Sequence, residues 1–528
     1  MSVSTEALPD DNNQLKEIIY SLKKEISLIT QDKEYYFNKY LQLQQITFGK
    51  KSEKIKVFPD ESEQSRLFNE AEHVAAPTKD DKENKVEVKS HRRRKSGRAP
   101  IPDSIPLKPR IHDLPEDQKN CSHCGKTMSY IGDDKSKELY RIPEKIYAVE
   151  HIVKKYACNC DGRVLAGLPA VVSAAPKRLL PGSIVSPALL AYIAVSKYLY
   201  GIPLFRLSSM FKSQNIDISR ATMSNWILTA AQKLKEIVEF FLGEIRKNIV
   251  IGIDETTVRN LGEKDRKGKS YMWVIRTLTV NAGQICFYHY RTTRSAEFLS
   301  DFLKNYIGKV ITDGYTAYNS LLQALGLVHA GCWAHVRRKF VKILITNKDS
   351  PEAKIIIELI GKLYALEKLY RENNFTDTEL KIFRQKYSKR VVREIHAYIK
   401  SWHGSFPEKS PMGDAMSYAL SQWRKLVLFL KYPELPLDTN AVEREIRPFV
   451  IGRKNWLFIG STVGAFASSL FYSIILTAKA NQHEPWEYLT YLFTKWPYAI
   501  TESDKRDLMP WNVTPQAVRD FLDADGRN

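Results

Sequence analysis

The sequence predicts a multidomain α+β protein. With 528 residues, the chain is too long for one ordinary hydrophobic core. Apolar residues recur at helical spacing near the N-terminus and through much of the remaining chain, whereas residues 248–293 form three β-rich segments bounded by turn residues. A polar, highly charged segment from about residue 58 to residue 96 separates the first helical region from the rest. We therefore expect several units, taken below in chain order.

The charge of the chain indicates a polyanionic partner. Its formal net charge is +20 and its pI is about 9.4. Nucleic acid fits such a charge because neutralising phosphates releases counterions. No basic segment followed by an apolar run opens the sequence, and apolar-rich stretches such as residues 469–478 are shorter than the roughly 20 residues of a membrane span. We expect a cytoplasmic protein with no membrane partner.

The N-terminal region is predicted to be a coiled coil followed by a linker. From Leu15 to Leu43, apolar or aromatic residues recur at alternating spacings of four and three, interrupted by Lys33. This pattern predicts a coiled coil over residues 1–48, with a helix packed on its own chain as the alternative. Residues 49–110 are predicted to be a basic flexible linker. Its basic run at 91–98 is either solvated or in contact with a phosphate backbone.

Four of the six cysteines form two close pairs within residues 111–176. In a reducing compartment such pairs favour a metal over disulfides, and four thiolates suit a structural zinc. We predict a small zinc-knuckle DNA-binding domain here. Buried reduced cysteines are the alternative, and His123 or His151 is a substitute ligand because the second pair is C-x-C. The predicted zinc ligands are Cys121, Cys124, Cys158 and Cys160.

Residues 177–246 are predicted to be helical throughout, with a helix-turn-helix inside them. Two helical segments flank the short stretch at 215–218, and Ser219 is the expected N-cap of the second. The first turns of that helix would meet base edges, although helix pairs with short turns also occur in many other helical domains. The predicted contacts are Arg220, Thr222, Ser224 and Asn225.

The β-rich segments then begin a mixed α/β unit. Three strands in a meander precede a helix, a short strand near 309–312, a helical segment and another strand near 327–333. This is the strand order of a ribonuclease-H-like sheet. A helical block separates this unit from its last part. The predicted boundaries are 247–345 for the first part of the core, 346–432 for the helical insertion, 433–482 for the last part and 483–528 for a C-terminal appendage.

Three acids are candidates for chemistry. Asp254 and Asp313 each follow an apolar strand, where a side chain at the sheet rim can hold a cation, although either is equally plausible as a turn or cap residue. The third would come from the helix near residues 437–448, in which Asp438 is the expected N-cap and Pro448 should end or kink the helix. Glu443 and Glu445 lie about 200° apart on that helix, so only one of them can face the site.

The residue types of this site favour a hard cation. Carboxylates without thiols or imidazoles suit Mg²⁺ or Mn²⁺ rather than zinc. Two such ions about 4 Å apart activate a water or a 3′ hydroxyl and stabilise the leaving oxygen of a phosphoryl displacement. The predicted activity is therefore that of a nuclease or a strand transferase.

Several motifs together resemble those of the bacterial DDE transposases of the insertion-sequence-sixty-six family. They run from near the N-terminus almost to the C-terminus: FGKKSEK, YACNC, IDETTVRNL, TDGYTAY, GCWAHVRRKF, NAVEREIRPFVIGRKNWLFIGS and LMPWN. The resemblance implies a ribonuclease-H-like core with its catalytic acids at Asp254, Asp313 and Glu443. Thr439, where the family usually has Asn, and the C-x-C knuckle depart from its pattern.

The resemblance also implies a function. We expect a transposase that binds the terminal inverted repeats of its element, cleaves 3′ ends and joins them to target DNA, with two Mg²⁺ or Mn²⁺ ions per active site. The alternatives are a transposase-derived DNA-binding regulator and a structure-directed nuclease. Homo-oligomerisation and accessory proteins of the same element are expected, in a bacterial cytoplasm with the DNA-bound protein at the nucleoid.

The remaining polar residues of these motifs have weaker predicted roles. His335 either contacts the scissile phosphate or positions a metal, or it is a structural histidine beside Trp333. Glu255 is left out because it should point away from Asp254 if the strand continues. The basic side chains either contact DNA phosphates or form a solvated basic face; they are Arg337, Arg338, Lys339, Arg453 and Lys454.

Overall fold

The chain divides into a small unit, residues 51–175, and a large unit that contains residues 176–528. The computed structural model describes residues 146–151, 155–157, 171–173, 176–263, 269–278, 283–295, 297–373 and 375–524. In the small unit, β1 (Lys155–Ala157) pairs with β2 (Val171–Ser173) in antiparallel fashion. The predicted coiled coil, the linker 49–110 and the four candidate zinc ligands lie outside the described residues.

The described large unit begins with four helices: α3 (Pro187–Tyr198), α4 (Leu204–Lys212), α5 (Arg220–Lys233) and α6 (Ile237–Lys247). The predicted helix pair is present as α4 and α5, which pack on each other. Ser219 caps α5 as expected, because its hydroxyl accepts from the amide of Thr222 at 3.1 Å. Arg220 and Asn225 are exposed, whereas Thr222 and Ser224 are half-buried.

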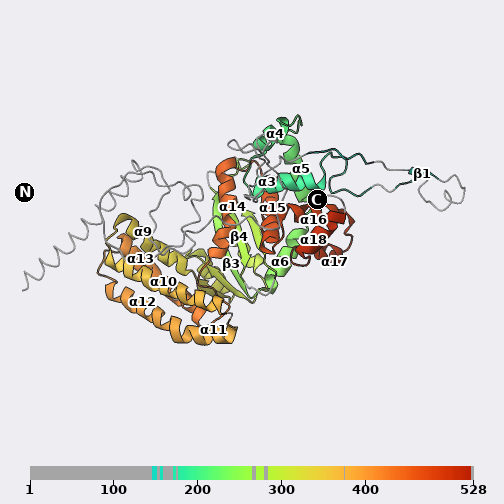
Figure 1. The fold of residues 1–528 in the computed structure, drawn as a ribbon. Helices are drawn as coiled ribbons and strands as arrows, with labels where there is room; N and C mark the ends of the chain where they lie inside the picture. The colour runs from blue at the N-terminus through green and yellow to red at the C-terminus, as the bar shows by residue number, and fades with distance from the viewer. Residues whose placement is uncertain are drawn as a thin grey trace, which may run out of the picture. The chain divides into compact units, whose positions relative to one another are not determined.

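A five-stranded sheet forms the centre of the large unit, in the order β5-β4-β3-β6-β7 (Figure 1). β3 pairs with β4, and β4 with β5, in antiparallel fashion, whereas β6 and β7 continue the sheet parallel to β3. This is the meander followed by parallel strands that the sequence predicts. The strands are β3 (Val250–Val258), β4 (Ser270–Thr277), β5 (Cys286–Arg291), β6 (Lys309–Thr312) and β7 (Val328–Gly331).

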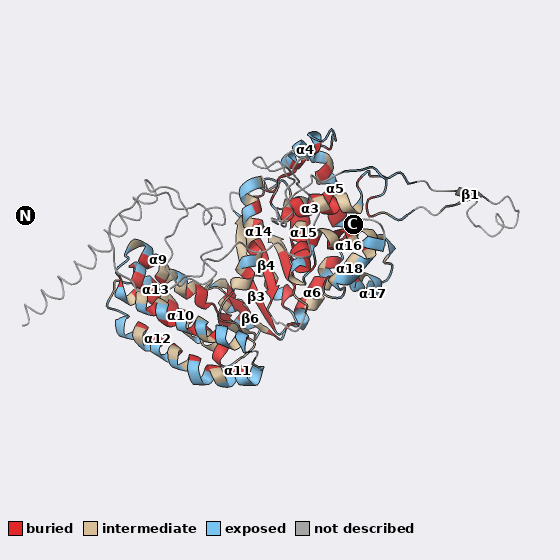
Figure 2. Cartoon of the chain, viewed as in Figure 1, coloured by how far each residue is buried: buried red, intermediate tan, exposed pale blue. Residues whose placement is uncertain are grey.

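Two C-terminal helices pack on the meander: α14 (Asn440–Trp456) on β3 and β4, and α15 (Thr462–Ala480) on β5. Among the described helices, α15 alone is long and apolar enough to pass for a membrane span. Its 19 residues make it longer than the apolar stretch expected from the sequence. Its residues are mostly buried within the protein (Figure 2), so its apolar character fits a core helix. Shorter helices between the strands are α7 (Phe298–Phe302) and α8 (Ala317–Ala324).

The predicted helical insertion lies between β7 and α14. Its side chains share a hydrophobic cluster with Val250, Ile311 and Ala330 of the sheet. Inside it the buried Arg384 pairs with Glu367 at 2.7 Å and donates to backbone carbonyls, so neither charge is left alone. Its helices are α9 (Trp333–Thr346), α10 (Pro351–Glu372), α11 (Asp377–Phe383), α12 (Lys389–Trp402) and α13 (Pro411–Leu426).

The chain ends in three helices, α16 (Pro485–Lys495), α17 (Glu502–Asp507) and α18 (Pro515–Ala524). α16 packs on α3 and α15, so the predicted C-terminal appendage is part of the large unit's core. The indole of Trp496, next to α16, donates to the carbonyl of Lys233 at 3.2 Å. These contacts join the two ends of the described large unit.

Candidate active site

Asp254 lies in the middle of β3, not at its end as the sequence suggested. The β-branched residues Thr256, Thr257 and Val258 extend the strand in its pairing with β4. The parallel pairing with β6 stops at Gly252, opposite Ile311. Asp254 therefore lies just beyond the end of the neighbouring parallel strand β6. On that side of β3 it is at the rim of the sheet, as expected for a cation-binding acid.

Asp313 follows β6 directly, as predicted. Its Oδ1 accepts from the amide of Tyr315 at 2.9 Å, which fixes the turn after the strand. The Oδ1 of Asp254 similarly accepts from the amide of Glu255 at 2.8 Å. Asp254 and Asp313 thus both lie just beyond the point where the parallel pairing of β3 with β6 ends.

Glu443 is in the first turn of α14, which lies close against β3. A glycine makes this approach possible, because a Cβ placed on Gly252 would lie 2.4 Å from Cγ2 of Val442. Val442 is fully buried at this contact and directly precedes Glu443. Glu443 is therefore positioned by the contact between Val442 and Gly252, and Gly252 lies two residues before Asp254 in the sequence.

The three acids influence one another electrostatically. Burial raises the pKa of Asp254 well above 3.8, and the charges of Glu255, Asp313 and Glu443 raise it further. Among the described residues, no Lys, Arg or His lies within ion-pair distance of Asp254. A cation between these acids would relieve that unfavourable concentration of negative charge.

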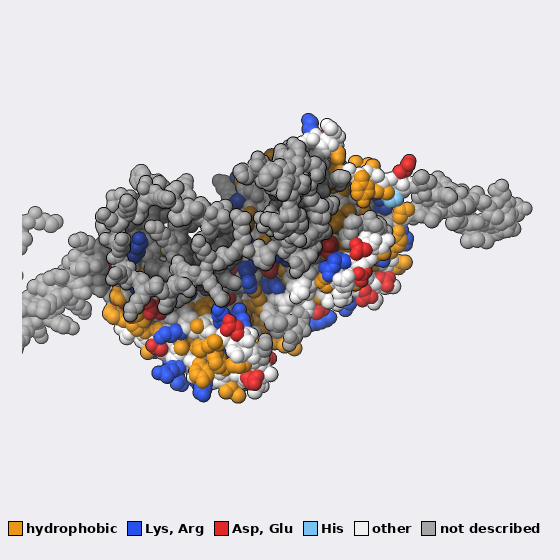
Figure 3. Space-filling model, in the orientation of Figure 1, with side chains coloured by type: hydrophobic (Ala, Val, Ile, Leu, Met, Phe, Trp, Pro, Cys, Tyr) orange, Lys and Arg blue, Asp and Glu red, His pale blue; other side chains and the backbone are white. Residues whose placement is uncertain are grey.

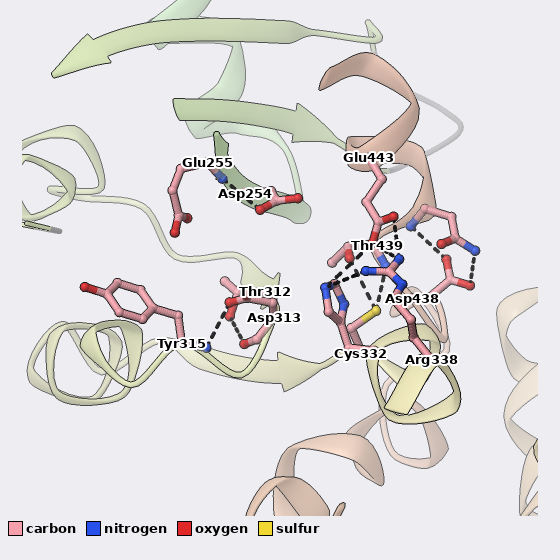
Figure 4. Close-up of polar contacts among 12 residues, drawn as sticks. Asp254, Glu255, Thr312, Asp313, Tyr315, Cys332, Arg338, Asp438, Thr439 and Glu443 are labelled. Atoms are coloured by element: carbon pink, nitrogen blue, oxygen red, sulfur yellow. Dashed lines mark hydrogen bonds and ion pairs between the residues drawn. The ribbon is translucent and has the colours of Figure 1, made fainter. Parts of the chain in front are cut away.

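Glu443 is turned toward a cation of α9 (Figure 4). Nη2 of Arg338 donates to both its carboxylate oxygens, at 2.8 and 2.7 Å, and Nε2 of His335 is 3.7 Å from Oε1. Burial, followed by the charge of Arg338, lowers the pKa of His335 below its ordinary value. In the part of the chain that is described, no three His, Cys, Asp or Glu side chains are gathered closely enough to hold a metal ion.

The chemistry of the donor set nevertheless fits a hard divalent cation. Asp254, Asp313 and Glu443 offer carboxylate oxygens only, which are the ligands of Mg²⁺ and Mn²⁺. Asp254 has a backbone amide as its partner and keeps further acceptor capacity. The carboxylate of Glu443 would have to leave Arg338 to join such a site.

Glu255 belongs to a separate network, consistent with its exclusion from the site. Its side chain is 2% exposed, pairs with Arg294 at 2.6 Å and accepts from the hydroxyl of Tyr318 at 2.5 Å. The guanidinium of Arg294 also lies 3.8 Å from the ring centroid of Tyr315. Sequence reasoning missed this network, which links the strand of Asp254 to the turn that follows Asp313.

Glu445 points away from the candidate site, as the helical spacing requires. It lies 3.6 Å from Arg276 of β4, so it is paired with a basic residue. The N-cap expected for this helix is wrong, and the helix does not end at Pro448. Thr439 is the N-cap, and Asp438 instead accepts from the amide of Asn440 at 3.0 Å. Pro448 is inside α14, which continues to Trp456 because apolar residues on both sides of the proline are packed in the core.

The predicted DNA-contacting cations have diverse partners. Lys339 pairs with Asp414 at 2.7 Å, and Arg453 donates to the hydroxyls of Thr256 and Thr257 at 3.2 and 3.3 Å. Arg337 is half-buried and Lys454 is exposed. Among the described residues visible in Figure 3, basic side chains are interspersed with acids instead of gathered in one patch. Arg338 differs from the others because its partner is a candidate catalytic acid.

Comparison with known families assigns the chain. A family model described as "Transposase IS66 family" matches residues 182–467, which is more than half of the chain and contains all three candidate acids. The chain belongs to the IS66 transposase family. A model of the "IS66 C-terminal element" matches residues 473–511, which include the last eight residues of α15 and all of α16.

The N-terminal part matches two further models of IS66-type transposases. One, the "zinc-finger binding domain of transposase IS66", matches residues 118–161 and contains the four candidate cysteines, which supports a structural zinc. The other, "Transposase C of IS166 homeodomain", matches residues 39–108. The chain is thus an insertion-sequence transposase with DNA-binding and zinc-finger regions.

Full-length relatives of this IS66 transposase occur in Sinorhizobium fredii (strain NBRC 101917 / NGR234). The uncharacterized protein y4qI is 28% identical over 495 residues, covering 90% of this chain and 88% of the relative. The uncharacterized protein y4jD is 26% identical over 527 residues, covering 97% and 98%. The similarity therefore extends through the N-terminal regions as well as the sheet.

Proposed function

We propose that this IS66 transposase cleaves DNA at the 3′ ends of its element and transfers those ends to target DNA. One observation carries the proposal: Asp254 and Asp313 lie where adjacent parallel strands part, and the helix that carries Glu443 packs on the strand of Asp254. The strand order of the sheet also supports a ribonuclease-H-like core.

The three acids would hold two Mg²⁺ or Mn²⁺ ions. Bound there, such ions supply an activated water or 3′ hydroxyl and stabilise the leaving oxygen of the cleaved strand. Asp254 and Asp313 would supply carboxylates from the sheet, and Glu443 would supply one from α14. Arg338 and His335 lie beside Glu443 and are placed to contact a phosphate oxygen.

Other parts of the chain would bind and assemble the DNA. We assign recognition of the terminal inverted repeats to the zinc-finger region with its cysteines, to the first turn of α5 and to the basic residues of α9 and α14. Homo-oligomerisation, through a coiled coil over residues 1–48, would bring two ends together. The protein would act in the bacterial cytoplasm, at the nucleoid when DNA-bound, with accessory proteins of the same element as further partners.

The test is metal-dependent nicking of a duplex that carries the inverted repeat flanking the gene. We expect the full chain to nick one strand at the element end with Mg²⁺, and Glu443→Gln to lower the rate on the order of 10³-fold. Glu445→Gln is the matched control, because it changes the same functional group on the opposite side of α14, and it should retain nicking. Retained activity in Glu443→Gln with loss in Glu445→Gln would refute the assignment.

The same experiment separates the two rival functions. A transposase-derived regulator would bind the duplex without nicking it at any Mg²⁺ concentration. A structure-directed nuclease would cut a branched duplex of unrelated sequence as readily as the element end. The presence of all three acids in one electrostatic environment favours the transposase over the regulator.

A further inference from the structure

Arg338 binds the carboxylate of Glu443, which is the only one of the three candidate acids that lies on a helix. A single guanidinium nitrogen donates to both carboxylate oxygens of Glu443, at 2.8 and 2.7 Å, across 105 residues of sequence. The exposed fractions are 44% for the side chain of Arg338 and 22% for that of Glu443. An ion pair this accessible to water is weak and can exchange its partners.

This contact conflicts with a role of Glu443 in holding a cation. Both carboxylate oxygens already accept from a positive group, and a divalent ion at the same oxygens would be repelled by that group. The other group in ion-pair range of Glu443 among the described ion pairs is His335, whose Nε2 is 3.7 Å from Oε1. Glu443 must therefore leave Arg338 before it can bind a metal ion.

A DNA phosphate is the natural competitor for Arg338. The planar guanidinium binds phosphate with the same geometry that it uses for carboxylate. Nη1 of Arg338 also donates to Nε2 of His335 at 3.3 Å, and this contact orients the guanidinium from which a phosphate oxygen could accept. The neighbouring Lys339 is paired with Asp414 on α13, which is not one of the three acids, and so it does not offer the same exchange.

We propose that Arg338 is a positioning residue that couples DNA binding to metal binding. Without DNA in the site, Arg338 holds Glu443. When a phosphate of the DNA takes the guanidinium, the carboxylate of Glu443 is released to join Asp254 and Asp313. This inference rests on the proposed function and adds to it an order of assembly, in which the complete metal site forms only around DNA.

The proposal has a thermodynamic consequence that a merely structural ion pair lacks. Because coupling is reciprocal, DNA must raise the affinity for the metal by the same factor by which the metal raises the affinity for DNA. Removing Arg338 should abolish much of this coupling. It should also increase metal affinity in the absence of DNA, whereas loss of a structural contact would decrease it.

The experiment measures Mn²⁺ binding to the full chain by electron paramagnetic resonance, without DNA. We expect Arg338→Gln to bind Mn²⁺ about 5- to 10-fold more tightly than wild type. Lys339→Gln is the matched control, because it removes one positive charge at the adjacent position without touching Glu443, and we expect a change below about 2-fold. Arg338→Lys keeps the charge and should give an affinity between those of wild type and Arg338→Gln.

A second arm adds the duplex with the flanking inverted repeat. Mn²⁺ affinity of the wild type should rise about 10-fold, with little rise in Arg338→Gln. Equal Mn²⁺ affinities of Arg338→Gln and Lys339→Gln without DNA would overturn the inference while leaving the metal site in place. If Asp254→Asn leaves Mn²⁺ binding of the wild-type chain unchanged, the proposed function itself fails.

Discussion

At the scale of single residues, Asp254 has the clearest energetic signature. Its burial and the neighbouring acids raise its pKa well above 3.8, so the ionised form is less favourable in the folded chain than in the unfolded one. Stability is therefore lost as the pH rises through the raised pKa and is restored as the pH falls toward 3.8. A buried acid whose pKa is raised in this way is more consistent with a functional role than with a purely structural one.

This signature predicts that Asp254→Asn stabilises the protein. At a pH above the raised pKa of Asp254 the variant should be more stable than the wild type, with the difference shrinking as the pH is lowered toward 3.8. Thermal unfolding followed by circular dichroism across this range measures the effect. Mg²⁺ should stabilise the wild type more than the variant, because the ion binds the folded state through the carboxylate. An equal loss of stability in the variant at every pH would contradict the prediction.

The sequence predicts the three candidate acids but not the residues that they contact. Helical geometry alone places Glu443 and Glu445 on different sides of one helix, and the structure bears this out. The pairing of Glu443 with Arg338 joins residues 105 positions apart, so no local spacing indicates it. The network of Glu255 is hidden for the same reason, because its partner Tyr318 is 63 positions away.

At the scale of elements, the approach of α14 to β3 decides where Glu443 lies. Gly252 permits it, because the strand has no side chain at the point where Val442 packs. The sequence places a glycine two residues before Asp254, yet nothing local shows which helix would lie on it. The contact joins residues 252 and 442 and exists only in the tertiary structure.

Gly252→Ala should disturb this contact and with it the site. The added Cβ would lie 2.4 Å from the side chain of the fully buried Val442, and such overpacking costs about 1–3 kcal/mol. We expect a lower midpoint of thermal unfolding together with weaker Mn²⁺ binding, since Glu443 moves with the helix.

Gly361→Ala in α10 is the matched control. A Cβ there meets nothing within 4 Å, so alanine should stabilise the helix by about 0.5–1 kcal/mol and leave Mn²⁺ binding unchanged. If Gly252→Ala is as harmless as this control, the close approach of α14 does not hold Glu443.

Element boundaries were predicted less well than element types. The order of strands and the position of the helical insertion follow from apolar periodicity, which is a property of each segment. The end of β3 depends on its pairing with β4, and the continuation of α14 through Pro448 depends on packing against the sheet. Both are effects of tertiary structure that override local preference.

At the scale of the whole molecule, the regions matched by the zinc-finger and homeodomain models and the three candidate acids lie in different parts of the chain. The family matches place a homeodomain-type region and a zinc finger before residue 162, whereas the three acids lie between residues 254 and 443 of the large unit. A net charge of +20 suits a protein whose substrate is DNA throughout. The sequence predicted this division from its cysteine spacing and charge, since both are read without knowledge of the fold.

The order of assembly that we infer links these parts. DNA held by the N-terminal regions would bring a phosphate to Arg338, and only then would Glu443 meet Asp254 and Asp313. Such an arrangement would restrict cleavage to DNA that the whole protein has bound. It depends on the central claim that these three acids hold the metal ions.

The location of Mn²⁺ in a crystal of the full chain bound to the flanking inverted repeat tests that claim most directly. Anomalous scattering should place manganese within about 2.5 Å of carboxylate oxygens of Asp254, Asp313 and Glu443, with Arg338 turned to a phosphate. Manganese bound without Glu443, while that residue remains paired with Arg338 in the presence of DNA, would contradict the account.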